Sequence, residues 1–340
     1  MKKTFFFALA MMVAANAFAY DKQTWNYETG AKLSTGSSGV HALDIYYPET
    51  GEGPYPVFIW LSANIGNGGV SKETAYSFAS VLIDTVLHRG YAVVVPNCNY
   101  QGKDNQPLPL HDIKAVVRFL RNNGEGMSEY LQNIDTSFIT IGGFSTGGLI
   151  ATMMGMQKWG NFEDWYEGTV GNFTDKSSSV DAVASWSGFY VTPDNLVSFE
   201  NVLKNIADGS RYYLFVLNSF TANAQDPSPE VVFHGSQDGV IRQADANLLY
   251  TWLQDRGADS EYYLMNGQIH GLITGSSNYY YYGYMVNFLD RIRAKKAAAA
   301  TAVEQIGQDA NAKHQKLLID GHLLIEHNGK TYNAQGAEVQ

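Results

Sequence analysis

Short apolar runs alternate with amphipathic stretches between about residues 40 and 292 of the chain. The runs at residues 91–96 and 138–141 are rich in β-branched and aromatic residues and carry no charge, as expected for strands buried on both faces. We predict strands at residues 41–47, 57–61, 91–96, 138–141, 180–186, 231–234 and 262–265.

Amphipathic helices are predicted between these strands. The segments 75–89 and 242–256 each end at a glycine, which is a helix C-cap signal. In residues 110–122 the apolar positions recur at i, i+3, i+4 and i+7, and residues 149–156 also read as a helix. Such alternation predicts an α/β fold, with a mostly parallel central sheet and helices on both of its faces.

The N-terminus has the pattern of a signal peptide. Lys2 and Lys3 precede an apolar run at residues 5–15, and Ala17-Phe18-Ala19 forms a cleavage site before Tyr20. The apolar run is too short to span a bilayer, so we predict no membrane insertion. The alternative is a first strand or helix of the core. We therefore expect residues 1–19 to be removed and the protein to be secreted, periplasmic or held at the cell surface.

The composition changes after residue 293. The Ala-rich and polar run at 297–315 is predicted to be a linker, which separates a catalytic domain at 20–296 from a tail at 316–340. In the tail, two short apolar runs flank Asp320-Gly321, a β-hairpin signal. The tail resembles C-terminal segments of exported Bacteroidetes proteins, which implies an export or sorting signal; a hairpin that packs on the domain is the alternative.

Charge and cysteine content narrow the class of protein. The net charge of −10, without a basic run, argues against a nucleic-acid partner and against adhesion to anionic lipid. Cys98 is the only cysteine, so no intramolecular disulfide can form. We interpret it as a buried, inert thiol.

The segment Gly143-Phe144-Ser145-Thr146-Gly147 lies between a predicted strand and a predicted helix. A G-x-S-x-G motif in this position is typical of a nucleophile elbow, where glycines leave room for the strained turn that exposes the serine. Ser145 is therefore the candidate nucleophile.

A nucleophilic serine needs a base and a group that orients the base, which follow in the order acid, histidine. Asp238 follows the strand at 231–234, and His270 follows the strand at 262–265. Asp226 is the rival acid but precedes its strand. We interpret His234 as structural and His111 as a surface or capping residue. No cluster has metal-ligand spacing, and no cofactor is expected.

The chain resembles the esterase/lipase branch of the α/β-hydrolase family over about residues 38–292, especially secreted bacterial esterases of acylated plant polysaccharides. The matching segments include 89–97 (RGYAVVVPN), 110–120 (LHDIKAVVRFL) and 171–178 (GNFTDKSS). The resemblance implies the α/β-hydrolase fold, a Ser145, Asp238 and His270 triad, and an acetyl or feruloyl ester, as in acetyl xylan and feruloyl esterases. The expected substrate is a small ester or an acylated oligosaccharide.

One loop departs from the family pattern. The family commonly has H-G-G-G where this chain has residues 62–65 (SANI). An oxyanion hole needs one backbone N–H from this loop and one from the residue after the nucleophile. Thr146 supplies the second, and Ala63 or Asn64 supplies the first.

Aromatic residues give two candidate substrate contacts. Trp159 and Trp165 lie in residues 156–179, which form either a lid or pocket wall or a surface excursion. Tyr279 and Tyr280 follow His270 and either stack on a sugar or aromatic acyl group or pack at the start of the last helix.

Two other functions use the same fold. A serine peptidase of prolyl-oligopeptidase type shares the catalytic domain, although this chain has no repeat blades. A non-catalytic binding protein is the second alternative, because the oxyanion loop is altered.

Overall fold

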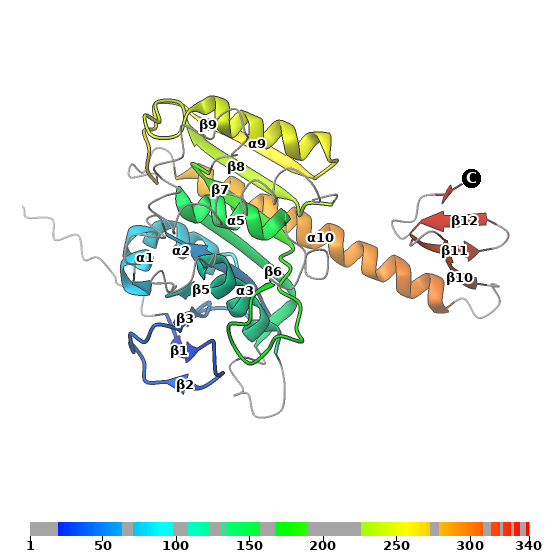
Figure 1. The fold of residues 1–340 in the computed structure, drawn as a ribbon, viewed down its shortest axis with the longest axis horizontal. Coiled ribbons are helices and arrows are strands. Elements are labelled where there is room, and N and C mark those ends of the chain that lie inside the picture. The colour runs from blue at the N-terminus through cyan, green and yellow to red at the C-terminus, as the bar shows by residue number, and fades with distance from the viewer. Residues whose placement is uncertain are drawn as a thin grey trace, which may run out of the picture.

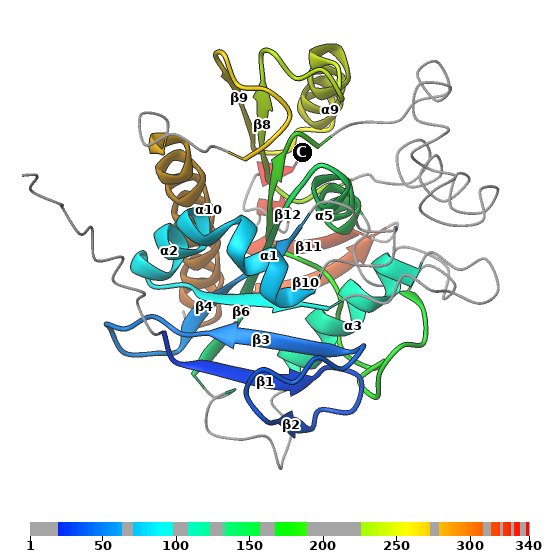
Figure 2. The same ribbon diagram turned by 90° about the vertical axis from the view of Figure 1, so that its left-hand side faces the viewer.

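The computed structural model describes residues 20–62, 71–97, 108–122, 131, 133–156, 167–188, 226–272, 279–308, 314–319, 322–327, 330–333 and 338–339. Nine of the described strands form one twisted sheet with helices on both faces (Figure 1, Figure 2). These strands are β1 (Lys22–Asn26), β2 (Lys32–Leu33), β3 (Ala42–Tyr46), β4 (Tyr55–Leu61), β5 (Ala92–Pro96), β6 (Ile134–Phe144), β7 (Ala182–Trp186), β8 (Glu230–Gly235) and β9 (Ser260–Met265).

The strand order in this sheet is β2-β1-β3-β5-β4-β6-β7-β8-β9. The six strands β4 to β9 pair with one another in parallel, whereas β1, β2 and β3 form antiparallel pairs at one edge of the sheet. The predicted α/β-hydrolase fold with a mostly parallel sheet is confirmed. The carboxyl ends of β4, β6, β8 and β9 therefore meet along one rim, where ligands bind in open α/β sheets.

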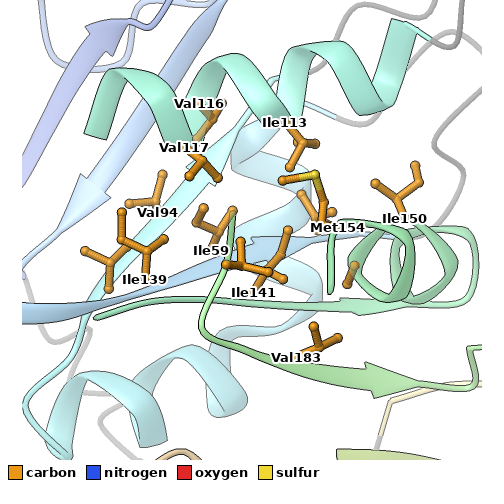
Figure 3. Packing of buried hydrophobic residues seen from close by; sticks show 14 of the residues in the cluster. Ile59, Val94, Ile113, Val116, Val117, Ile139, Ile141, Ile150, Met154 and Val183 are labelled. Carbon is orange, nitrogen blue, oxygen red and sulfur yellow. The ribbon is translucent and has the colours of Figure 1, made fainter. Parts of the chain in front are cut away.

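Two apolar layers cover the sheet. On one face, the helices are α3 (Leu108–Arg121), α5 (Thr146–Met156) and α9 (Gln243–Asp255). Figure 3 shows Ile113 and Met154 of these helices above Ile59 and Ile141 of the strands. The other face packs against α1 (Lys72–Phe78), α2 (Ser80–His88) and α10 (Tyr280–Gln308). Burial on both faces explains why the central strands are continuous apolar runs.

The single helix predicted at residues 75–89 is instead two helices. The side chain of Ser71 caps α1 by accepting a hydrogen bond from the Thr74 N–H. The chain leaves the helical conformation at Ala79, whose φ is −115°, and α2 then begins at Ser80. The predicted C-cap glycine at the end of α2 is confirmed, because Gly90 has a φ of 86°.

The last helix continues into the segment that was predicted to be a linker. Residues 297–308, predicted as the start of a linker, continue α10 through Gln308. The reason is the alanine content of this run, since alanine has the highest helix propensity. No helix in the part of the chain described here has the length and apolarity of a membrane span.

The predicted C-terminal hairpin is confirmed and enlarged. β10 (His314–Ile319) pairs antiparallel with β11 (His322–His327), and β12 (Lys330–Asn333) and β13 (Glu338–Val339) complete a four-stranded sheet. In Figure 1 this small sheet lies beyond the C-terminal end of α10, apart from the large sheet.

Candidate active site

Ser145 occupies a sharp turn between β6 and α5. Its φ is 56°, in the left-handed region that few residues other than glycine adopt. Two backbone hydrogen bonds hold the turn: the Ser145 N–H donates to the Trp186 carbonyl (2.8 Å), and its own carbonyl accepts from the Leu149 N–H (3.0 Å). The strained conformation is therefore built into the sheet and the helix on either side.

The glycines on both sides of Ser145 have no space for a side chain. A Cβ atom at Gly143 would collide with the backbone of Gly147. A Cβ atom at Gly147 would lie 2.5 Å from the carbonyl oxygens of both Leu61 and Ser62. The spacing of the motif thus reflects the close approach of the elbow to the end of β4.

The structure brings His270 and Asp238 to Ser145. The Nε2 atom of His270 lies 3.0 Å from the Ser145 Oγ, and its Nδ1 atom lies 2.8 Å from Asp238 Oδ2. An ionised carboxylate only accepts hydrogen bonds, so Nδ1 carries the proton and Nε2 is free to accept one from the serine hydroxyl. This is the arrangement of a nucleophile, a base and an orienting acid.

Asp238 is held ionised by its hydrogen bonds. Its Oδ1 atom accepts from the Val240 and Ile241 amides, both at 2.8 Å. Burial by itself would raise the pKa of Asp238, but hydrogen bonds from His270 and the two amides outweigh burial and lower it to about 2. The acid therefore stays negatively charged throughout the neutral range.

The loops that carry the acid and the histidine are joined to each other. The Gln237 N–H donates to the Gln268 carbonyl (2.9 Å), and the Gly267 N–H donates to the Ser236 hydroxyl (2.8 Å). Gly235 has no room for a side chain, because its α-carbon faces the Gln268 carbonyl. The separation of Asp238 and His270 is thus set by backbone contacts.

The candidate oxyanion donors lie partly within the described residues. Thr146 is the first residue of α5, so its N–H has no acceptor within the helix and lies at the positive end of the helix dipole. Ala63 and Asn64 lie outside the described residues. Their loop begins next to the nucleophile elbow, because the carbonyl oxygen of Ser62, the residue before Ala63, lies against the α-carbon of Gly147.

A family model for BD-FAE matches residues 43–253, which is more than half of the chain. The chain belongs to the BD-FAE family. Membership makes the chain a carboxylic ester hydrolase of the α/β-hydrolase fold. A comparison with curated proteins finds no match.

Solved structures agree with this BD-FAE membership. A truncated carbohydrate esterase from gut microbiota is 25% identical, with a TM-score of 0.64 over 80% of this chain and 96% of that chain. A bifunctional GH43-CE protein of Bacteroides eggerthii is also 25% identical, with a TM-score of 0.62 over 79% of this chain and 38% of that chain. Esterase 2 of Thermogutta terrifontis, bound to propionate, shares the fold at 16% identity, with a TM-score of 0.58 over 74% of this chain and 89% of that chain.

In this BD-FAE chain an aromatic path leads from the catalytic rim to the surface. Phe144 is buried and its ring centroid lies 4.9 Å from that of His270. Phe78, at the end of α1, contacts Phe144 at 5.5 Å and is 46% exposed. Neither residue was predicted to belong to the site. Phe144 could have been found as the residue before Ser145, whereas only the tertiary packing of α1 brings Phe78 to the site.

Of the four aromatic residues predicted to contact the substrate, the structure describes two, Tyr279 and Tyr280. Trp159 and Trp165 lie outside the described residues. Tyr279 packs against the core and stacks on the buried Tyr282, with centroids 5.8 Å apart. Tyr280 is half-exposed, in ring contact with Tyr281 and Tyr284. Tyr280 is thus the more exposed of the two tyrosines.

The described part of the predicted lid segment is packed onto α3. Glu167 accepts hydrogen bonds from Lys114 (2.7 Å) and Ser178 (2.7 Å), and Arg118 donates to the Val170 carbonyl (2.8 Å). Burial lowers the pKa of Lys114, and the negative charge of Glu167 acts in the opposite direction. Residues 167–179 are therefore fixed by buried charges, and the residues before them lie outside the described part.

The competing histidines and acids fall in other places. His111 was predicted to be a surface or capping residue, but it is buried in α3 beneath Gly168, because α3 turns this face to the 167–179 segment. Asp226 precedes β8 and is exposed, as its position in the sequence suggested. His234 is buried at the end of β8. Among the described residues, no group of histidine, cysteine or acidic side chains is arranged to hold a metal ion.

Proposed function

We propose that this esterase acts through Ser145 as nucleophile, His270 as general base and Asp238 as the acid that orients the histidine. The observation that carries the proposal is the continuous hydrogen-bonded path from the Ser145 Oγ through the imidazole to the buried carboxylate, with links of 3.0 and 2.8 Å. The left-handed φ of Ser145 supports it, because such strain is typical of nucleophile elbows.

The mechanism is acyl transfer in two halves. His270 Nε2 takes the proton of Ser145 as Oγ bonds to the ester carbonyl carbon, and the negative charge on the carbonyl oxygen is met by N–H donors. Thr146 supplies one donor and Ala63 or Asn64 the other. The imidazolium then protonates the departing alcohol oxygen as its bond to the carbonyl carbon breaks. In the second half, His270 takes a proton from water, the hydroxide attacks the acyl group, and Ser145 leaves with the proton.

Kinetics of variants test this assignment. Ser145→Ala is expected to lower kcat for a p-nitrophenyl ester by about 10⁴- to 10⁶-fold, and His270→Ala by a similar factor, because the residues act as one unit. Ser187→Ala is a matched control, since Ser187 is another buried serine with a left-handed φ at the end of a strand. Retained turnover by Ser145→Ala would exclude Ser145 as the nucleophile.

We further propose that the ester is an acetyl or feruloyl group on a plant polysaccharide and that the protein is exported. The support for the substrate is the likeness to carbohydrate esterases at 25% identity and the exposed ring of Phe78, which offers an apolar surface two ring contacts from His270. The half-exposed Tyr280 offers a ring face for a sugar. The support for export is the signal-peptide pattern of residues 1–19.

Acyl and leaving-group preference are measured by comparing acetyl, feruloyl and long-chain esters, together with acetylated and feruloylated xylan oligosaccharides, on one preparation. We expect acetyl or feruloyl esters to be hydrolysed with the highest kcat/KM. A preference for long acyl chains would contradict the carbohydrate substrate. N-terminal sequencing of the exported protein is expected to begin at Tyr20.

The two rival functions separate in the same experiments. A peptidase of prolyl-oligopeptidase type would cleave a proline-containing chromogenic peptide, which we expect to stay intact. A non-catalytic binding protein would hydrolyse none of the esters and would leave Ser145 unreactive.

A further inference from the structure

A second histidine lies directly behind the proposed acid. His234 is near the carboxyl end of β8, and its side chain is fully buried. Its Nε2 atom lies 3.1 Å from the Ile241 carbonyl oxygen. Its Nδ1 atom is buried and has no hydrogen-bond partner among the described residues. None of the proposed catalytic steps uses this side chain.

These contacts fix the tautomer of His234. A carbonyl oxygen only accepts hydrogen bonds, so Nε2 carries the proton and donates it to Ile241. A proton added to Nδ1 would be a buried donor without an acceptor, on a charged ring without solvent. The imidazole is therefore neutral and protonated on Nε2.

The hydrogen bond reaches the acid through a single residue. The carbonyl of Ile241 accepts from His234, and the amide of Ile241 donates to Asp238 Oδ1 at 2.8 Å. Hydrogen bonds thus hold both the carbonyl and the amide of Ile241 in place. Val240 donates the second amide bond to the same carboxylate oxygen. His234 therefore clamps the short loop whose amides hold Asp238 while Oδ2 faces His270.

The charged groups around His234 come from three elements. Asp238 is nearest, with its Oδ2 atom 4.0 Å from Nε2, and His270 and Asp245 also act on the ring. Burial lowers the pKa of His234, and this outweighs the attraction of the two carboxylates. A neutral ring at this distance leaves Asp238 Oδ2 to His270, whereas an imidazolium would compete with His270 for it.

We infer that His234 is a positioning residue of the ester-hydrolysis site, which as a neutral donor to Ile241 fixes the amide cradle of Asp238 and reserves the carboxylate for His270. This inference rests on the proposed triad. It differs from an ordinary core role in one respect: loss of the N–H donor lowers the rate of the chemical step even where the protein stays folded.

Three variants distinguish the effect of losing the N–H donor of His234 from the effect of changing the volume of its ring. His234→Leu fills the space without a donor, and His234→Gln keeps an N–H donor at about the position of Nε2. Thr140→Val is the matched control, because Thr140 is also fully buried and donates to a strand carbonyl, that of Val57, at 2.7 Å. We expect kcat to fall by about 10- to 100-fold in His234→Leu, with KM within about twofold. His234→Gln is expected to recover most of the rate, and Thr140→Val to keep it.

Full kcat in a folded His234→Leu variant, or an equal loss in His234→Leu and His234→Gln, would overturn the inference while leaving the triad intact. The triad fails separately, through turnover by Ser145→Ala. If the His234 variants do not fold, ¹⁵N spectra of the histidine rings in the unaltered protein decide. They are expected to show His234 protonated on Nε2 alone from pH 8 to pH 6, and a proton on Nδ1 within that range would overturn the inference.

Discussion

Gly147 lies where the nucleophile elbow touches the end of β4, and its α-carbon faces the Leu61 and Ser62 carbonyl oxygens. Gly147→Ala would push the Ser62 carbonyl, and with it the start of the proposed oxyanion loop, away from Ser145. We expect kcat to fall by on the order of 10²-fold, since a displacement of about 1 Å at a site has that effect. Gly283→Ala is the control, because Gly283 lies in α10 with open space around it. Equal kcat/KM values for the two variants would contradict this account of the motif.

Glu230 is a buried acid outside the proposed site. It lies at the start of β8, and its carboxyl group accepts a hydrogen bond from the Thr152 hydroxyl at 2.7 Å. Burial raises the pKa of Glu230 from 4.5 to about 7, against the effect of Thr152. The folded state therefore holds a proton that the unfolded state releases between these two pH values.

The consequence is a loss of stability as pH rises. Between about pH 4.5 and pH 7 the unfolded state binds fewer protons at this residue, so the free energy of unfolding falls, by on the order of 3 kcal/mol in total. Glu230→Gln is expected to remove this part of the pH dependence in urea unfolding curves. An unchanged dependence in the variant would contradict a raised pKa.

The element α1 carries Phe78 to the site and is anchored by a buried charge. Lys72 Nζ lies 3.0 Å from Asp44 Oδ2 on β3, and both side chains are fully buried. Lys22 and the Thr24 hydroxyl also contact Asp44, at 3.3 and 2.6 Å. The fixed position of α1 relative to the sheet therefore depends on this cluster.

The half-exposed Glu73 carboxylate also contacts Lys72 Nζ, so Asp44→Asn leaves the buried ammonium with a partly solvated partner in place of a buried one. Asp44→Asn is expected to lower the free energy of unfolding by about 3 kcal/mol, and Asp44→Asn combined with Lys72→Met by less, because the buried ammonium is then absent. Urea unfolding measures both. If Asp44→Asn were as stable as the unaltered protein, the cluster would not anchor α1.

How well the sequence predicts a helix or strand depends on how many of its faces are buried. Strands such as β5 and β8 are covered on both faces, so their apolar runs are unmistakable. β1 and β2 lie at the antiparallel edge and include polar residues, and no strand was predicted there. The break at Ala79 falls inside continuous amphipathic spacing, so the pattern indicated one helix.

The candidate site is predictable where chain order and chemistry coincide. Ser145, Asp238 and His270 each follow a parallel strand, and such strand ends meet at one rim. Phe78 lies on a helix whose angle to the sheet depends on contacts distant in sequence, such as Lys72 with Asp44. The role inferred for His234 depends on which nitrogen meets Ile241, and that is a property of the folded loop.

At the scale of the whole molecule, the C-terminal sheet is attached beyond the last helix of the catalytic domain. The sheet of β10 to β13 lies past the end of α10 (Figure 1), and Ile292 is the last buried residue among the side chains of α10 that the structure describes. A chain that ends at Gln308 is expected to keep kcat/KM within about twofold, since it retains every described group of the site. Ester hydrolysis and thermal unfolding measure the effect. A large loss of activity would show that the tail contributes to the site.

The central claim is that Ser145 is the nucleophile of this esterase. Its most direct test is labelling with a fluorophosphonate, followed by mass spectrometry of the peptides. We expect one phosphonyl group per chain, attached to Ser145, with labelling lost in Ser145→Ala and strongly slowed in His270→Ala. An actively hydrolysing protein in which Ser145 stays unlabelled, or in which the label is on another residue, would contradict this claim.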